Sequence, residues 1–201
     1  LKADTQDRTF SIDASAYYID WNDIQLSTVI NGNNTIINAG AARIKGAELV
    51  LIARPESGVT ISGAFAFNDG EVKAANAALG AAKGDRLPNT AHVTATVSAD
   101  YVLRSHAATP SVGTTLRYIG DRTNGFAANP GNPQYQLPDY ILVDLRAGFE
   151  LGSIDVHAYV ANLFDQRGQL SAQTFQTAFG GPAQIAIVRP RSIGVNISTK
   201  F

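Results

Sequence analysis

Cysteine and methionine are both missing from this chain of 201 residues. Without cysteine the chain has no disulfide framework, no thiolate nucleophile and no cysteine-ligated metal site. Because the sequence opens on Leu1 and carries no methionine, we expect it to be excerpted or processed from a longer protein. No basic stretch followed by an apolar one marks a secretory signal peptide.

Charge is scarce as well. Charged residues make up 16% of the chain and the formal net charge is −1. In soluble proteins about a quarter of all residues are charged. A nucleic-acid-binding surface needs a basic stripe, so no nucleic-acid partner is expected. No apolar run approaches the roughly 20 residues of a membrane-spanning helix. These absences exclude nucleic-acid binding and helical membrane insertion.

Apolar and polar residues alternate with a period of two, which indicates strands with one apolar face. Each alternating segment has about 12–16 residues, whereas strands of globular proteins most often have about 5–6. Strands that cross a bilayer need about 9–11 residues plus extensions. The segments are 9–21, 41–54, 58–69, 89–104, 109–121, 138–150, 153–164 and 190–201.

The apolar faces of these segments carry no charge in the middle. In segment 41–54 the alternation is less regular, since Ile44, Val50 and Ile52 fall on the polar face. A charge at the bilayer midplane costs about 2–4 kcal/mol, so a lipid-facing surface has to exclude it. The charges that share the apolar parity all lie at one end of antiparallel strands, and they are Asp20, Arg43, Lys45, Asp69, Asp139 and Arg191.

Connections between the segments alternate in length. Tight turns occupy 55–57, 105–108 and 151–152, and long connections occupy 22–40, 70–88, 122–137 and 165–189. Outer-membrane barrels combine short periplasmic turns with long extracellular loops.

Aromatic residues gather at both ends of the segments, as in the two interfacial girdles of such barrels. The predicted girdles are Tyr17, Tyr18, Trp21, Phe65, Phe67, Tyr118, Tyr140 and Phe164 on the loop side, and Phe10, Tyr101, Phe149 and Phe201 on the turn side. The sequence thus predicts an all-β fold, an antiparallel transmembrane β-barrel segment of about eight strands.

Several motifs resemble the C-terminal barrel of TonB-dependent outer-membrane receptors. The strongest is Ala-Tyr-Val-Ala-Asn-Leu-Phe-Asp at 158–165, and the aromatic-terminated stretch 189–201 is similar to the family's last strand. Three further stretches are similar to motifs of the family. They are Asn38-Ala39-Gly40 with the following Lys-Gly-Ala-Glu-Leu at 45–49, Gly-Asp-Arg-Leu-Pro at 84–88, and Tyr-Ile-Leu-Val-Asp-Leu-Arg at 140–146. Ile44 and Gly168 depart from the family pattern, because an aromatic residue is common at both places.

The resemblance implies that residues 1–201 are the last eight of 22 strands, in the outer membrane of a bacterium. It places a plug domain, the TonB contact and the first strands outside this chain. It implies a receptor, not an enzyme, for a scarce ligand such as a ferric siderophore. The expected partners are TonB, that ligand, the lipid bilayer and the barrel-assembly machinery, which would recognise the strand ending at Phe201.

No catalytic, cofactor-binding or metal-binding residue is predicted. His92 and His157 fall on the polar face and His106 in a turn, without the spacing of a metal site. Asp144 with Arg146, and Asp155 with His157, share the polar face and suit pairing or solvation there. Long loops are the only ligand surface that the pattern offers, with the polar and aromatic residues Asn31, Asn33, Asn34, Asn124, Phe126, Tyr135, Phe175 and Phe179.

Two other interpretations remain open at this point. Eight strands can close on themselves, so the chain also suits a self-contained outer-membrane barrel with a structural or adhesive role. A soluble all-β binding module would alternate in the same way, although the low charge and the long strands oppose it.

Overall fold

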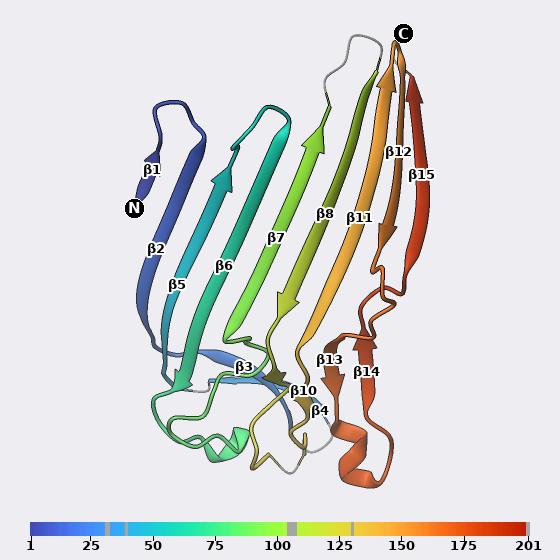
Figure 1. The fold of residues 1–201 in the computed structure, drawn as a ribbon. Coiled ribbons are helices and arrows are strands. Elements are labelled where there is room, and N and C mark those ends of the chain that lie inside the picture. Colours follow the sequence, from blue (N-terminus) through green and yellow to red (C-terminus); the bar gives the residue numbers. More distant parts are fainter. Residues whose placement is uncertain (31–32, 39, 104–107, 130, 200–201) are drawn as a thin grey trace.

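The computed structural model describes residues 1–30, 33–38, 40–103, 108–129 and 131–199. Its main element is one antiparallel sheet in which each strand pairs with the next one along the chain, apart from short strands in the loops (Figure 1). The nine strands, in spatial order, are β1 (Lys2–Asp4), β2 (Phe10–Trp21), β5 (Ala42–Ala53), β6 (Val59–Val72), β7 (Val93–Val102), β8 (Thr109–Ile119), β11 (Tyr140–Leu151), β12 (Ile154–Ala161) and β15 (Ser192–Thr199).

The eight predicted strand segments are confirmed. Each overlaps one of the eight long strands, and the observed bounds lie within a few residues of the predicted ones. The ninth strand, β1, was not predicted because three residues are too few to show alternation. Period-two alternation locates these strands because every second side chain points to the same face.

The strand register places the apolar residues of all eight long strands on one face. A row that runs from the turn end of β2 to the loop end of β15 crosses the sheet without a charged residue. It consists of Phe10, Ala53, Ile61, Ala99, Thr114, Leu145, Val160 and Ile193. A shift of one residue between any two strands would turn one apolar set to the other face. The alternation therefore fixes the register along with the strands.

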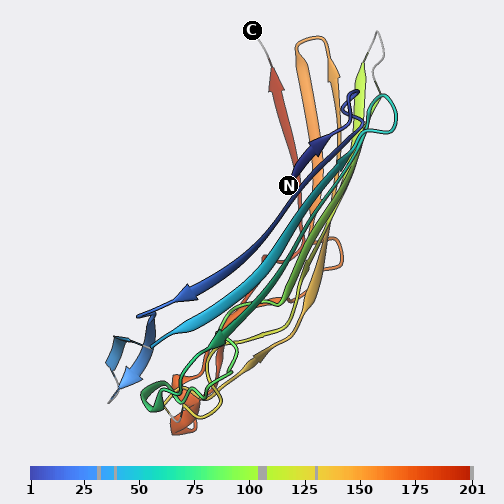
Figure 2. The same cartoon turned by 90° about the vertical axis from the view of Figure 1, so that its left-hand side faces the viewer.

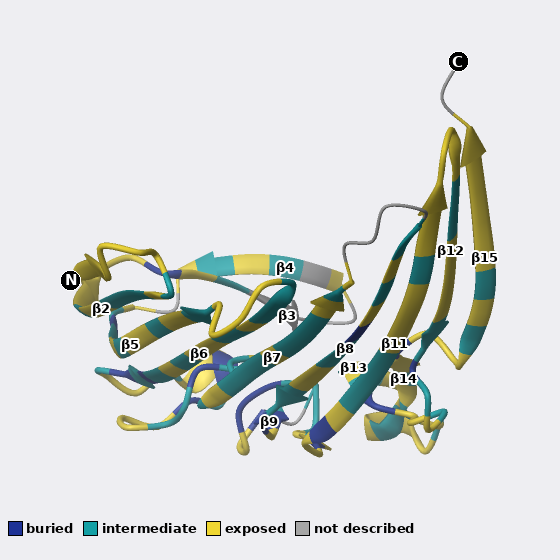
Figure 3. Ribbon diagram, turned by 45° about the horizontal axis from the view of Figure 1, so that its top comes forward, coloured by how far each residue is buried: buried dark blue, intermediate teal, exposed yellow. Residues whose placement is uncertain are grey.

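Within the described residues, no second layer covers this apolar face. Viewed along its edge, the sheet is a single curved layer with the loops gathered at one end (Figure 2). Ile193, Val195 and Ile197 of β15 are 75%, 63% and 70% exposed. Colouring by burial shows strands of intermediate and exposed residues, with buried residues mostly near the loops (Figure 3). An apolar face of this size suits contact with lipid and would be a liability in water.

Charged side chains at the loop end of the strands form ion pairs with their neighbours. Arg43 Nη1 lies 3.3 Å from Glu71 Oε1, and Lys73 Nζ lies 3.0 Å from Asp20 Oδ1. Lys45 stands opposite Asp69 in the β5–β6 register. The predicted confinement of charges to one end of the apolar face is confirmed for these strands.

The long connections are folded, which the sequence pattern did not predict. Three of them contain hairpins, formed by β3 (Gln25–Ile30) with β4 (Asn33–Asn38), β9 (Arg122–Thr123) with β10 (Gln136–Leu137), and β13 (Gln169–Gln173) with β14 (Gln184–Ile187). Two short 3₁₀ helices, Ala77–Leu79 and Phe175–Phe179, lie in the second and fourth connections. A hairpin this short lacks a face pattern long enough to be distinguished from a polar loop.

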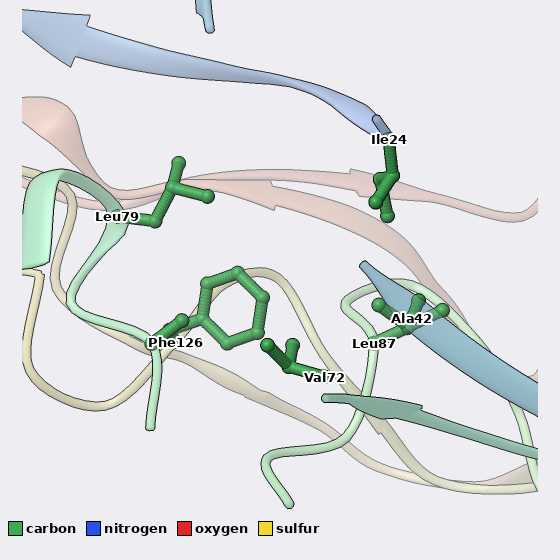
Figure 4. Packing of buried hydrophobic residues seen from close by; sticks show 7 residues of the cluster. Ile24, Ala42, Val72, Leu79, Leu87 and Phe126 are labelled. Carbon is green, nitrogen blue, oxygen red and sulfur yellow. The ribbon is translucent and has the colours of Figure 1, made fainter. Parts of the chain in front are cut away.

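Buried apolar residues gather in these connections and not beneath the sheet. Side chains from connections 22–40, 70–88 and 122–137 pack on the strand ends Ala42 and Val72 (Figure 4). We call this group the loop cluster, and it consists of Ile24, Ala42, Val72, Leu79, Ala81, Leu87 and Phe126. The loops at this end therefore share a hydrophobic core of their own, which holds them together beyond the strand ends.

The sheet is open. Within the described residues, β1 and β2 at one edge do not pair with β15 at the other edge. The interpretation as a self-contained eight-stranded barrel is therefore wrong, because such a barrel needs both edges joined. Among the described residues there is also no helix of sufficient length and apolar character to span a membrane.

Placing a charge on the apolar face tests this orientation of the sheet. Val97 lies mid-strand on β7 and is 37% exposed on the apolar face, while the adjacent Thr96 lies on the polar face. We expect Val97→Lys, introduced into the full-length protein in phospholipid vesicles, to lower the free energy of unfolding by about 2–4 kcal/mol. The matched control Thr96→Lys should change it much less. Equal losses measured by urea titration would contradict the assignment of the two faces.

Candidate functional site

The polar face carries a ladder of ion pairs across its central strands. Arg146 of β11 donates through Nε to Asp100 Oδ1 of β7 at 2.9 Å and through Nη1 to Thr115 Oγ1 at 2.8 Å. Gly113 of β8 stands between Asp100 and Arg146 in the register. A Cβ atom at Gly113 would lie 2.2 Å from Asp100 Oδ1, so glycine makes room for a pair that spans three strands.

A second pair connects the ladder to the end of β12. Arg117 of β8 pairs with Asp144 of β11 through Oδ2. The other carboxylate oxygen, Oδ1, accepts the backbone N–H of Asn162 at 2.8 Å. The prediction that Asp144 and Arg146 lie on the polar face is confirmed; Asp144 pairs with the adjacent strand β8, and Arg146 pairs across β8 with β7.

Asn162 is the centre of a hydrogen-bonded junction. It is 4% exposed and has a φ of 52°, in the left-handed region that asparagine tolerates better than most residues. Its Nδ2 donates to the carbonyls of Gln166 at 2.9 Å and Arg189 at 3.0 Å, and its Oδ1 accepts the Gln166 N–H at 2.9 Å. One side chain thereby joins both ends of connection 165–189.

Asp165, three residues later, completes the junction. Its Oδ1 accepts the backbone N–H of Arg191 at 2.9 Å, and its Oδ2 accepts from Arg167 Nη2 at 2.9 Å. The Arg191 hydrogen bond, aided by the nearby guanidinium groups, holds the pKa of Asp165 below its ordinary value. The Asn-Leu-Phe-Asp motif therefore links the end of β12 to the start of β15 by hydrogen bonds.

A cavity of about 500 Å³ opens on the polar face at the loop end of the sheet. Its floor follows one register row through Glu48, Ala66, Thr94, Ile119 and Tyr140. Residues 89–91 and the loop residue Arg122 also line it. Six strands and two connections therefore contribute to this concavity, which we call the loop-end cavity.

Two predicted girdle residues lie in the loop-end cavity instead. Tyr17 lies over Gly46 of the adjacent strand, where a Cβ atom would be 2.2 Å from the ring, and Tyr140 is only 7% exposed. Both have the polar-face parity, so their assignment to the loop-side girdle is wrong. Their odd or even position within the strand could have shown that they face the cavity. Their place near the strand end had suggested the girdle instead. Phe67 and Phe164 remain exposed near the loop end, as predicted. Trp21 is also exposed, but it shares the polar-face parity of Tyr17, so its assignment to the girdle is wrong as well. Phe201 lies outside the described residues.

Several predicted loop residues serve packing. Phe126 is 4% exposed within the loop cluster. Asn124 accepts the Tyr135 N–H at 2.7 Å and donates to Thr174 Oγ1 at 3.0 Å, so it joins two loops. Phe175 packs edge-on against Phe179, which is 76% exposed. The structure describes Asn33 at the turn of its hairpin but no side chain for Asn34, and Asn31 lies outside the described residues.

The histidines are separated. His157 lies on the polar face with Nε2 3.0 Å from Asp155 Oδ1. His92 precedes β7 and stacks on Phe67 of the apolar face at 6.2 Å, so its predicted place on the polar face is wrong. His106 lies outside the described residues. No group of three metal-ligating side chains is present in the described part of the chain.

A family model described as "TonB dependent receptor-like, beta-barrel" matches residues 1–163. The chain belongs to the TonB-dependent receptor family. The predicted family is thereby confirmed, and with it the assignment to a β-barrel of the bacterial outer membrane.

Known receptors resemble this chain over part of their length. The metal-pseudopaline receptor CntO of Pseudomonas aeruginosa is 32% identical over 134 residues, which cover 64% of this chain and 18% of CntO. The structure of the ferric yersiniabactin uptake receptor FyuA from Yersinia pestis matches with a TM-score of 0.81 at 20% identity, covering 100% of this chain and 28% of FyuA. The outer-membrane ferripyoverdine receptor of Pseudomonas aeruginosa matches with a TM-score of 0.72 at 13% identity, covering 100% of this chain and 26% of that receptor.

These relatives are receptors and not enzymes, in agreement with the prediction from sequence. The chain spans less than a third of each relative's length. It therefore matches one section of each of these relatives, and the loop-end cavity lies on the polar face of its sheet.

Removing the Asn162 side chain tests the junction. Asn162→Ala leaves the Gln166 N–H and the carbonyls of Gln166 and Arg189 without their partner, and each unsatisfied buried group costs about 1–3 kcal/mol. In the full-length receptor we expect trypsin to cut after Arg167, which precedes Gly168, at least tenfold faster. Asn196→Ala, on the exposed polar face of β15, is the control. Unchanged cleavage in Asn162→Ala would show that the junction does not hold this loop.

Acid titration tests the contribution of Asp165. Because its folded pKa is lowered, its stabilisation is fully present above the ordinary aspartate pKa and is lost as the pH falls through the folded value. We expect the urea midpoint of the full-length receptor to exceed that of Asp165→Asn at pH 7. The two midpoints should converge when the pH falls below about 4 and through the lowered pKa. A difference that persists undiminished at low pH would contradict a charged role for this carboxylate.

Proposed function

We propose that this chain is the C-terminal portion of a receptor that imports a scarce metal chelate, such as a ferric siderophore, with energy supplied through TonB. The observation that carries the proposal is the family match over residues 1–163, combined with an open barrel wall whose loop end holds a cavity. Its relatives include receptors for metal-pseudopaline and for ferric yersiniabactin.

In this proposal residues 1–201 supply barrel wall and outer loops and perform no catalytic step. The plug domain, the TonB contact and the remaining strands of a 22-stranded barrel belong to the part of the receptor outside this chain. The unpaired edges of β1–β2 and β15 support this division, since an unpaired strand edge inside a bilayer is costly. We further propose that the strand leading to Phe201 is recognised by the barrel-assembly machinery.

Uptake by a deletion strain tests the proposed function. We expect loss of the gene to abolish accumulation of at least one member of a panel of ⁵⁵Fe-labelled siderophores and ⁶⁵Zn-labelled metal chelates. A plasmid copy of the gene should restore uptake, and deletion of tonB should abolish it again. Unchanged uptake across the whole panel would contradict the proposed import of a metal chelate. Restored uptake in cells without TonB would contradict the energy coupling.

A further inference from the structure

A hollow of about 500 Å³ lies on the apolar face of the sheet, towards the turn end of β2, β5 and β6. Phe10 and Ile61 line it on the turn side, and Phe65 lines it on the loop side. One register row runs through it across five strands, and this row consists of Ala3, Ile12, Leu51, Gly63 and Val97. Gly63 leaves the hollow open, since a Cβ atom there would lie 2.9 Å from the Phe65 ring. We call this hollow the apolar groove.

The membrane setting determines what can fill the apolar groove. Its lining is almost entirely apolar, so water would find no hydrogen-bonding partners in it. An empty groove would lack the dispersion contacts that a filled one makes. Short turns of outer-membrane barrels lie on the periplasmic side. The groove therefore faces the acyl chains of the periplasmic leaflet, which supplies phospholipids.

A polar hollow adjoins the apolar groove at the turn between β1 and β2, and the two share Asp4, Thr5 and Phe10. Asp7 also lines the polar hollow. The Thr9 hydroxyl donates to Asp7 Oδ2 at 2.7 Å and the Thr9 N–H donates to Oδ1 at 3.0 Å, which lowers the pKa of Asp7 to about 2. Asp7 is thus charged at neutral pH, and each of its oxygens keeps a further lone pair. The Asp4 carboxylate is exposed and has no partner among the described residues.

Two arginines lie at the same end of the sheet. The Arg54 N–H donates to the Thr9 carbonyl at 2.7 Å, and Arg54 Nη1 donates to the Arg8 carbonyl at 3.5 Å. The β1–β2 and β5–β6 turns are therefore neighbours (Figure 1). Neither arginine forms an ion pair within the described part of the chain. Carboxylates and free guanidinium groups together suit a headgroup that carries both an ammonium group and a phosphate.

We propose that the apolar groove and the adjoining polar hollow bind one phospholipid of the periplasmic leaflet, with an acyl chain in the groove and an ammonium headgroup against Asp4 and Asp7. A volume of about 500 Å³ lies within the range of about 300–1,000 Å³ that small-molecule sites have. The change from apolar to polar lining at the strand end matches the two parts of an amphiphile. The inference goes beyond the proposed import and holds for any imported ligand.

Lipid retention by the full-length receptor tests the site. The receptor in detergent is equilibrated with equimolar phosphatidylethanolamine and phosphatidylglycerol, and native mass spectrometry identifies the lipid that stays bound. We expect phosphatidylethanolamine to be retained in preference. Ala53→Phe fills the apolar groove and should lower this retention at least about tenfold. Ala99→Phe, on the same face and register row but outside the groove, is the matched control and should retain the lipid.

Asp4→Asn tests the headgroup separately from the acyl chain. Loss of the carboxylate should lower retention of phosphatidylethanolamine several-fold without lowering that of phosphatidylglycerol, because only the former carries an ammonium group. Glu56→Gln removes an exposed carboxylate that lines neither hollow and should behave as the wild type does. Equal retention of both lipids by the wild type, or of neither, would overturn the proposal. So would wild-type retention in Ala53→Phe, or an equal loss in Ala53→Phe and Ala99→Phe. This measurement needs neither TonB nor an imported ligand, so its failure is separable from failure of the proposed import.

Discussion

The structure depends on the requirement that a sheet crossing a bilayer presents one uncharged face to lipid while every backbone group pairs with a neighbouring strand. Each long strand therefore alternates, and the register aligns the apolar sets from Phe10 to Ile193. A soluble protein would cover such a face with a second layer. Here the face is left bare, and the buried apolar residues lie in the loops. The location of the core follows directly from the membrane setting.

Because one face of the sheet is apolar, the ion pairs and side-chain hydrogen bonds between strands and loops lie on the other face and at the loop end. On the polar face the pair Arg117–Asp144 connects the neighbouring strands β8 and β11, and the pair Asp100–Arg146 reaches across β8 from β7 to β11. Asn162 extends this network into the loop that contacts Arg122. The loop cluster and the Asn162 junction thereby turn four long connections into a folded end with a defined cavity. A rigid site of this kind is better prepared to bind a ligand than separate flexible loops.

The sequence was sufficient for the fold class, because strand, face and register all follow from the same alternation. It also located the charges of the loop end, since Asp20 and Arg43 interrupt an otherwise apolar parity. The pattern was insufficient for the site. Tyr17 and Tyr140 were assigned to lipid from their position near strand ends, although their parity places them in the cavity. Arg122 went unnoticed because its burial arises from contacts with connection 165–189, almost fifty residues away in the chain. Contacts between distant loops leave no periodic signal in the sequence.

The central claim is that alternate residues of these strands face lipid and a polar interior, and site-directed labelling tests it most directly. The chain has no cysteine, so single cysteines at each position from Val93 to Val102 of β7 add no background within it. Each is labelled with a nitroxide in the full-length receptor in vesicles, and its accessibility to oxygen and to a water-soluble nickel chelate is compared. The account predicts strict alternation, with oxygen favoured at Val93, Val97 and Ala99 and the nickel chelate at Thr94, Thr96 and Ser98. Equal access of the nickel chelate to both sets would contradict it.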